Sequence, residues 1–464
     1  MKERYSRQSL IPGWNQESLE KSYVAIVGGN NTPALTSFVS GGLAALGVGK
    51  LLLTGERIGD AGIFGFGGSI PKYISLLNSD ILVYPNEVRL SNQDITEYIL
   101  SETTEIPLNA IIDISNSQDS QYCCLSYGRA KKIPVFLGTS SLSGLAFFRS
   151  TEKREQRENI ESIVESILKF EAQKEGKINS LTLASIIIDE TKKTLMPFKG
   201  DVESTDLLYK NSDYLKYINK NILMVGAGAI GTFAGISLAV NGVKNLYIAD
   251  FDRIEIGNLG SQILYYGFDT FTDQNKASVL TTRLKEIARR YCFQQSNFNS
   301  LTSKVDADFV EFLEKNNIEA ILGCVDNMYT RAVLNMLSSH KQIPYIDGGS
   351  GKFGCDVFTV IPGRTACLNC QTAEGLKEAV VQEQQEKRKR EERDCIYEPS
   401  LIVPNQIAGA MIVNRLRRIE ATPNTTKFLS GDGIRHKQTI SKCKENCNPY
   451  LTIAEVQKFL KDGK

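Results

Sequence analysis

Histidine is almost absent from this chain. Its 464 residues include only His340 and His436, and neither lies near a candidate nucleophile along the sequence. Because a Ser-His or Cys-His hydrolase uses a histidine to activate its nucleophile, we expect no hydrolysis of that kind. We expect His340 at the end of a helix, just before a strand, and His436 in an exposed polar loop.

The sequence also lacks an excess of either charge, and it lacks long apolar runs. Lys plus Arg number 54 and Asp plus Glu number 53, which gives no electrostatic basis for general binding to nucleic acid or to anionic membranes. The longest apolar stretches, such as 234–240, are far shorter than the roughly 20 residues that span a bilayer. The first residues form no apolar signal region. We therefore expect a soluble, cytoplasmic protein without a membrane or nucleic-acid partner.

The sequence contains an internal duplication. With 42 % hydrophobic residues, a chain of this length has room for two or three domains of roughly 150 residues. Two apolar runs, 24–27 and 222–225, are each followed by glycine, then by a helical stretch and a second apolar run. This order predicts an α/β fold with two tandem Rossmann-like domains and mostly parallel sheets. Later segments that correspond are 110–113 and 320–323, 134–138 and 344–348, and the closing helices 181–194 and 406–419.

The two copies differ at the turn that follows the first strand. The second copy has a complete G-x-G-x-x-G, formed by Gly226, Gly228 and Gly231, which lets backbone N–H groups approach a phosphate at the start of a helix. Asp250, at the end of the next strand, is placed to bind a ribose hydroxyl. In the first copy the turn ends in Pro33, and the acidic position is Gly55. We expect a nucleotide in the second half and none in the first.

Several further motifs accompany this turn. Asp250-Phe251-Asp252 precedes Asn258-Leu259-Gly260-Ser261-Gln262, Lys276 begins a helix, and Cys324-Val325-Asp326-Asn327 follows a strand. With these motifs the sequence resembles the ubiquitin-activating-enzyme superfamily, which includes the molybdopterin and thiamine biosynthesis adenylyltransferases. The resemblance is strong over 221–450 and weak over 1–200. The segment 4–8, Arg-Tyr-Ser-Arg-Gln, is similar to the opening signature of that family.

The resemblance implies that the chain uses ATP to adenylate the C-terminal carboxylate of a protein. It implies that Asp326 holds Mg²⁺ and that Lys276 contacts the phosphates. It also implies that Asp250 binds the ribose and that Asn258 and Gln262 line the nucleotide pocket. Arg7 would reach this site from the first half. Taken alone, Asp326 is also compatible with a helix N-cap and Lys276 with a solvated helix lysine.

One position departs from the family pattern. Ser261 stands where the family has an arginine, so one phosphate-contacting cation is missing. Arg253 is a candidate to replace it. This loss puts the efficiency of adenylation in doubt.

Four of the ten cysteines form two close-spaced pairs. Cys367 and Cys370 form a C-x-x-C, and Cys443 and Cys447 form a C-x-x-x-C. Four thiolates in two such pairs are typical of a structural, tetrahedral Zn²⁺ site. The alternative is four free thiols. We expect zinc, holding the C-terminal segment to the second domain.

Cys395 is the candidate nucleophile. It follows a charged run over 382–393, in the place where the resemblance puts the crossover loop, here 371–399. Compact ubiquitin-like-activating enzymes carry their thioester-forming cysteine in that loop. Arg390 and Arg393 would lower its pKa, as a nucleophilic thiol requires. The alternative is an incidental thiol. Cys324 and Cys355 are expected to be buried, while Cys123, Cys124 and Cys292 have no motif around them.

The difference between the halves suggests an intramolecular pseudo-dimer. An inactive adenylation domain over 1–200 would be joined by a linker over 201–220 to an active one over 221–464, so that no higher oligomer is required. The leading interpretation is activation of a ubiquitin-like protein at its C-terminal glycine, with thioester formation on Cys395 and transfer to a conjugating enzyme. Three alternatives stay open: a sulfur-carrier adenylyltransferase, an adenylating enzyme for a ribosomally made peptide, and a pseudoenzyme scaffold.

Overall fold

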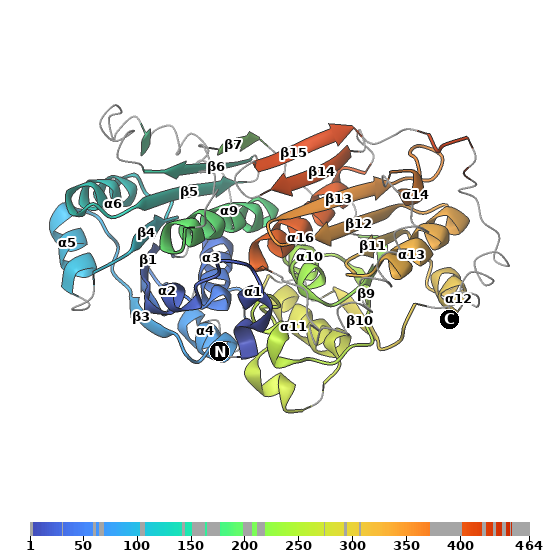
Figure 1. Cartoon of the computed structure of the whole chain (residues 1–464), viewed down its shortest axis with the longest axis horizontal. Helices are drawn as coiled ribbons and strands as arrows, with labels where there is room; N and C mark the ends of the chain where they lie inside the picture. Colours follow the sequence, from blue (N-terminus) through green and yellow to red (C-terminus); the bar gives the residue numbers. More distant parts are fainter. Residues whose placement is uncertain are drawn as a thin grey trace.

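The computed structural model contains two α/β halves that lie next to one another (Figure 1). It describes residues 3–29, 31–58, 62–64, 69–102, 107–141, 144–150, 163–164, 177–197, 207–210, 219–272, 274–291, 295–305, 308–371, 401–419, 424–429, 433–438, 442–445 and 447. No helix within these ranges is long and apolar enough to cross a membrane.

The first half is built on a seven-stranded sheet with the order β3-β2-β1-β4-β5-β6-β7. Its first five strands in that order are parallel, and β6 and β7 are antiparallel to their neighbours. The strands are β1 (Tyr23–Val27), β2 (Lys50–Thr54), β3 (Leu82–Asn86), β4 (Ala110–Asp113), β5 (Val135–Ser141), β6 (Gly144–Arg149) and β7 (Leu207–Lys210).

The second half repeats this topology and adds one strand. Its order is β10-β9-β8-β11-β12-β13-β14-β15, again with five parallel strands followed by antiparallel ones. The strands are β8 (Asn221–Val225), β9 (Asn245–Ala249), β10 (Asn297–Leu301), β11 (Ala320–Gly323), β12 (Tyr345–Ser350), β13 (Gly354–Val360), β14 (Asn424–Leu429) and β15 (Gly433–Gln438). The predicted α/β fold with two tandem Rossmann-like sheets is therefore confirmed.

Helices cover both faces of each sheet, as crossover connections between parallel strands require. In the first half they are α1 (Ser6–Ser9), α2 (Gln16–Lys21), α3 (Pro33–Leu46), α4 (Ile70–Leu77), α5 (Gln93–Glu102), α6 (Gln118–Lys131) and α9 (Lys177–Leu195), with the 3-10 turn η1 (Glu3–Tyr5). In the second half they are α10 (Ala229–Val240), α11 (Lys276–Arg290), α12 (Asp308–Lys315), α13 (Met328–Lys341), α14 (Leu368–Gln371) and α16 (Ile402–Arg417), with η4 (Ile256–Asn258) and η5 (Gly267–Thr270).

One hydrophobic core joins the two halves. Alternate residues of the first strands, Val24 and Ile26 in β1 and Ile222 and Met224 in β8, all belong to it. The opposite residues of these strands belong to two outer cores, one beneath α5 and α6 and the other beneath α12 and α13. Because side chains alternate along a strand, each sheet has one face toward the other half and one face toward its own outer helices.

The closing helices of the two halves, α9 and α16, lie side by side at the centre of the molecule (Figure 1). The Gln406 side-chain amide donates a hydrogen bond to the Leu181 carbonyl oxygen over 3.3 Å. These helices also make matching contacts within their own halves: Ser140 is bonded to Ser180 at 2.6 Å, and Ser350 to Asn405 at 2.7 Å. The expected duplication is thus visible in side-chain contacts as well as in strand order.

Three details differ from the sequence-based expectations. The stretch 201–220, expected as a polar linker, contains β7, which pairs with β6 of the first sheet. His436, expected in a polar loop, lies in β15. Both closing helices begin four residues earlier than expected, at Lys177 and Ile402. His340 does lie in the last turn of its helix, α13.

Candidate functional site

The glycine-rich turn of the second half joins β8 to α10. Gly226 has φ of +100°, and a Cβ at this position would lie 2.4 Å from the Cys324 carbonyl oxygen. A Cβ at Gly231 would lie 2.0 Å from the Gly226 carbonyl oxygen. At Gly228, in contrast, no heavy atom of the described residues, apart from its two chain neighbours, lies within 4 Å of the place where a Cβ would be. Two of the glycines therefore close the turn, and the third borders open space at the first N–H groups of α10.

The corresponding turn of the first half differs in its helix start and in the residue after the second strand. Its helix α3 begins only at Pro33, whereas α10 begins directly after Gly228. Gly28 is as crowded as its counterpart Gly226, since a Cβ there would lie 2.4 Å from the Thr36 hydroxyl. A Cβ at Gly55, the counterpart of Asp250, would lie 1.8 Å from the Gly28 carbonyl oxygen. Proline brings no N–H to the start of the helix, and no acidic side chain has room at Gly55. This geometry supports the expectation that only the second half binds a nucleotide.

Asp250 follows β9 and is bound to the glycine-rich turn. Its carboxylate accepts a hydrogen bond from the backbone N–H of Ala227 at 2.6 Å and from that of Asp252 at 2.8 Å. Burial raises the pKa of the Asp250 carboxyl group, and the two N–H donors together with the nearby charge of Lys276 oppose that rise. A carboxylate has about four lone-pair positions, so Asp250 retains acceptor capacity for ribose hydroxyls.

Lys276 begins α11 beside this acidic loop. Its ammonium group lies 3.1 Å from the Asp252 carboxylate, and the residue is only 8 % exposed. Asn275, the N-cap of the helix, donates to the carbonyl oxygens of Asp250 and Asp252, each over 3.0 Å. The Tyr265 hydroxyl lies within hydrogen-bond distance of the Ala227 and Lys276 carbonyl oxygens. The alternative of a solvated helix lysine is wrong, because the structure places Lys276 in this network.

Asn258 and Gln262 lie on and just after η4 and are almost fully buried. The Asn258 side-chain oxygen accepts from the Glu255 N–H. Among the described residues, neither the Asn258 amide nitrogen nor the Gln262 side-chain oxygen has a hydrogen-bond partner. Buried polar atoms are normally hydrogen-bonded, so these two atoms have hydrogen-bonding capacity left for water or a ligand. Ser261 is buried between them and carries no charge, and Arg253 is exposed.

The first residues of the chain pack against η4. The Ser6 hydroxyl lies 3.3 Å from the place where a Cβ at Gly257 would be, and the Arg4 carbonyl oxygen lies 2.9 Å from the corresponding place at Gly260. Tyr5, which is buried, holds this segment in place by accepting a hydrogen bond from Asn78 at 2.8 Å. Arg7 is half-buried in α1. The N-terminal segment of the first half therefore reaches the second half, as the family resemblance implied.

Asp326 lies in the loop between β11 and α13. The N-cap of α13 is Asn327, whose side chain accepts from the Thr330 N–H at 2.8 Å, so the alternative role of Asp326 as the cap is excluded. Asp326 is exposed, and none of the described residues makes an ion pair with it. An exposed, unpaired carboxylate is available for a cation such as Mg²⁺.

Sequence reasoning missed the buried ion pair between Arg331 and Asp347. The two side chains approach to 3.1 Å, and Asp347 is completely buried in β12. The Tyr345 hydroxyl donates to the Asp347 carboxylate over 2.6 Å. Burial raises the pKa of Asp347, and Arg331 opposes this effect. A signal was present, since Arg331 follows Asp326 by five residues and Asp347 ends an apolar run before two glycines.

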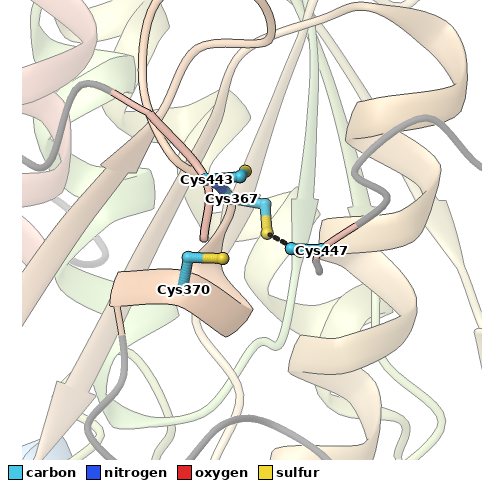
Figure 2. Close-up of side chains that lie close together, drawn as sticks. All are labelled: Cys367, Cys370, Cys443 and Cys447. Carbon is cyan, nitrogen blue, oxygen red and sulfur yellow. Dashed lines mark hydrogen bonds between the residues drawn. The ribbon is translucent and has the colours of Figure 1, made fainter. Parts of the chain in front are cut away.

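The four paired cysteines converge on one point, as Figure 2 shows. Their sulfur atoms all lie within 4.8 Å of one another, and those of Cys367 and Cys447 are 3.5 Å apart. Four sulfurs at about 2.3 Å from one zinc ion lie roughly 3.8 Å apart in a tetrahedron, so the spacing fits this metal. Backbone N–H groups of Cys367 and Lys444 donate to the sulfurs of Cys443 and Cys370, both over 3.3 Å. Such donors stabilise thiolates.

The remaining cysteines are divided between buried and undescribed positions. Cys324 and Cys355 are buried, as expected. Cys123 and Cys124 are also buried, and burial raises the pKa of both thiols. Cys395, with nearly all of its expected crossover loop, and Cys292 lie outside the described residues.

The predicted nucleotide residues share one edge of the second sheet. The glycine-rich turn, Asp250 and Asp326 all follow the carboxyl ends of parallel strands, where α/β proteins bind their ligands. Asp250 and Lys276 meet through Asp252, and the turn contacts the segment before Asp326 through Cys324. The four cysteines form a separate cluster beside α13 and α14.

Three curated proteins illustrate the relatives of this chain. The SUMO-activating enzyme subunit uba-2 of Caenorhabditis elegans is 29 % identical over 160 residues, which cover 33 % of this chain and 25 % of that protein. The sulfur carrier protein ThiS adenylyltransferase of Bacillus subtilis (strain 168) is 33 % identical over 150 residues, which cover 32 % of this chain and 42 % of that protein. The ubiquitin-like modifier-activating enzyme 5 of Dictyostelium discoideum is 24 % identical over 262 residues, which cover 53 % of this chain and 66 % of that protein. The matches thus span less than two thirds of each relative.

The family match is broader. Residues 205–450, more than half of the chain, match the ThiF family. This segment contains the whole second sheet, the glycine-rich turn and the four-cysteine cluster. The chain belongs to the ThiF family.

Proposed function

We propose that this protein uses ATP to adenylate the C-terminal carboxylate of a ubiquitin-like or sulfur-carrier protein. The observation that carries the proposal is the asymmetry between the halves at the residue after the second strand. In the second half Asp250 accepts the Ala227 N–H, whereas the equivalent Gly55 has no room for a side chain, because a Cβ there would lie 1.8 Å from the Gly28 carbonyl oxygen. ThiF-family membership and relatives named as SUMO-activating, ThiS-adenylylating and ubiquitin-like-modifier-activating enzymes support the same activity.

In this proposal the nucleotide lies across the carboxyl edge of the second sheet. The phosphates lie at Gly228, where the first N–H groups and the dipole of α10 favour negative charge. Asp250 accepts hydrogen bonds from the ribose through its remaining lone pairs. The unpartnered atoms of Asn258 and Gln262 are bonded by the nucleotide.

The reaction needs positioning and charge neutralisation more than covalent help. The substrate carboxylate attacks the α-phosphorus of ATP, a bond forms between the carboxylate oxygen and phosphorus, and pyrophosphate leaves. Lys276 and Arg7 supply positive charge near the phosphates. Asp326 is the residue that would hold Mg²⁺, which neutralises phosphate charge when it is bound.

We further propose that Cys395 accepts the activated protein as a thioester. Its thiolate attacks the acyl carbon of the adenylate, the carbon–sulfur bond forms, and AMP leaves with the oxygen that joined it to the acyl group. Transfer to a conjugating enzyme then follows. This step rests on the position of Cys395 in the sequence, between an arginine-containing charged run and Pro399.

A second candidate function is adenylation of a sulfur carrier without a stable thioester. The match to the ThiS adenylyltransferase, at 33 % identity, favours it specifically. The four-cysteine cluster serves either function, and we propose that it holds one structural Zn²⁺ through Cys367, Cys370, Cys443 and Cys447.

Purified protein, Mg-ATP and a set of ubiquitin-like and sulfur-carrier proteins ending in glycine would test these proposals. ATP–pyrophosphate exchange that depends on one of these partners is the expected result. An adduct that thiols cleave, present in wild type and in Cys292→Ala but absent from Cys395→Ala, would assign the thioester to Cys395. Exchange without an adduct would favour the sulfur-carrier function.

Two results would contradict the proposal for a carrier protein. Exchange driven only by short peptides ending in a free carboxylate would assign the chain to peptide modification. Absence of exchange with every partner, together with absence of ATP binding, would show a scaffold without adenylation activity.

A further inference from the structure

The Arg331 side chain connects the loop before α13 to the middle of β12. One terminal nitrogen pairs with the Asp347 carboxylate at 3.1 Å. The other donates to the carbonyl oxygens of Val325, at 2.9 Å, and Gly348, at 3.1 Å. A single guanidinium group thus binds the backbone that follows β11, at Val325, and two residues of β12, Asp347 and Gly348.

The site around this guanidinium group is closely fitted. A Cβ at Gly349 would lie 2.9 Å from two of its nitrogens, and a Cβ at Gly323 would lie 2.8 Å from the Asp347 carboxylate. Tyr345 donates a hydrogen bond to Asp347 from the other side. Asp347 is fully buried, so it needs a paired charge. This ion pair and the close contact at Gly349 restrict the guanidinium group of Arg331 to one position.

This arrangement restrains the backbone next to Asp326. Asp326 directly follows Val325, whose carbonyl oxygen Arg331 holds. The preceding residue, Cys324, contacts the glycine-rich turn at Gly226 and donates its N–H to the Val225 carbonyl oxygen at 2.8 Å. The backbone on the N-terminal side of Asp326 is thus fixed to the nucleotide turn and to Arg331, and on the other side Asn327 caps α13.

We propose that Arg331 is a positioning residue for the adenylation reaction: together with Asp347, it holds the Val325–Asp326 backbone so that the Asp326 carboxylate faces the bound nucleotide. This inference rests on the proposed function, in which Asp326 holds Mg²⁺. Arg331 acts through Asp326 and need not touch the substrate. Its planar fork makes three contacts at once, which a lysine ammonium group on a flexible stem does not reproduce.

The test compares Arg331→Lys, Arg331→Met, the double variant Arg331→Met with Asp347→Asn, and Asp326→Asn. Lys315→Met, at an exposed position on α12, is the control. We would measure the affinity for a non-hydrolysable ATP analogue with and without Mg²⁺, the Mg²⁺ concentration for half-maximal pyrophosphate exchange, and the melting temperature.

We expect wild type and Lys315→Met to bind the analogue more tightly with Mg²⁺ than without it. In Arg331→Met and in Asp326→Asn the gain in affinity caused by Mg²⁺ should fall by about tenfold or more. In Arg331→Lys the gain should lie between that of wild type and that of Arg331→Met. The double variant no longer contains an unpaired buried carboxylate, so it should recover melting temperature but not the response to Mg²⁺.

A double variant or an Arg331→Lys variant with a wild-type response to Mg²⁺ would overturn the positioning role. Failure of the proposed function is distinguishable from this outcome. In that case wild type itself shows no pyrophosphate exchange, while the analogue titration still reports whether Arg331 controls the Mg²⁺ response.

Discussion

The Tyr73 hydroxyl of the first half donates a hydrogen bond to the Ile263 carbonyl oxygen of the second half, over 3.2 Å. Tyr73 is almost fully buried, and its ring contacts the rings of Phe64 and Tyr266. Ile263 directly follows Gln262, one of the proposed nucleotide residues. The first half therefore supports the loop after η4 by packing, in addition to the contact of the Arg4–Ser6 segment with η4.

This contact predicts that a change in the first half weakens the site in the second. Tyr73→Ala should cost about 3–5 kcal/mol of unfolding free energy, because it removes a buried aromatic side chain, and it should also lower ATP affinity. Tyr73→Phe keeps the ring and should cost about 1 kcal/mol. Denaturant unfolding and analogue titration would measure both effects. An unchanged ATP affinity in Tyr73→Ala would show that the halves act independently.

The glycines of the second turn should respond differently to alanine. Gly231→Ala should destabilise the protein by more than about 2 kcal/mol, since the added Cβ would lie 2.0 Å from the Gly226 carbonyl oxygen. Gly228→Ala should change the unfolding free energy by less than about 0.5 kcal/mol, because its φ of −76° suits alanine and open space surrounds it. We nevertheless expect Gly228→Ala to lose ATP affinity about tenfold. Calorimetry and denaturant unfolding together separate the two effects, and unchanged affinity would place the phosphates elsewhere.

The first half begins its helix at Pro33 and has no room for an acidic side chain at Gly55, so we predict one nucleotide per chain. Isothermal titration with an ATP analogue should give a stoichiometry of one. Asp250→Ala should weaken this binding, and Thr36→Ala, in the first half, should leave it unchanged. Two equivalent sites per chain would contradict the assignment of the first half as a degenerate copy.

The four-cysteine cluster predicts one zinc ion per chain. Cys443→Ser should lose the metal and lower the melting temperature, because a structural zinc site contributes its binding energy to folding. Cys292→Ser should retain the metal. Metal analysis of each purified variant measures its zinc content directly. Purified wild type that contains no zinc, with the four cluster thiols free to react with a thiol reagent, would contradict the proposal.

Asp113 predicts a specific pH dependence of stability. Asp113 is fully buried, and its carboxylate accepts hydrogen bonds from the hydroxyls of Ser115 and Ser120. Burial raises the pKa of Asp113, and these hydrogen bonds oppose that rise. A raised pKa means that the folded state takes up the proton at a higher pH than the unfolded state does. The contribution of Asp113 to stability should therefore increase as the pH falls from 7.5 through the folded pKa, by about 1.4 kcal/mol per unit of pKa elevation.

Asp113→Asn removes this titration. The difference in unfolding free energy between wild type and Asp113→Asn should shift in favour of wild type between pH 7.5 and pH 4.5. Asp119→Asn, at an exposed position of α6, is the control. A difference that does not vary with pH would show that Asp113 has the same pKa in both states.

The sequence by itself determined the fold class, the duplication and the asymmetry between the copies. These features are local: an apolar strand, a glycine turn and a helix follow one another directly, and a proline or a missing acidic residue is visible at its own position. The cysteine spacing also predicted the cluster, because a tetrahedral site restricts the separation of paired ligands along the chain.

Only the tertiary structure decided which side chains meet. Lys276 and Asp252 are 24 positions apart, Arg331 and Asp347 16, and Tyr73 and Ile263 190; their contacts arise from parallel strands ending at one edge and from two halves sharing one core. It also assigned the cap of α13 to Asn327 and left Asp326 exposed, since capping depends on the exact residue at which the helix begins. Local pattern specifies the elements of this protein, whereas burial and long-range packing select the partners of its charged groups.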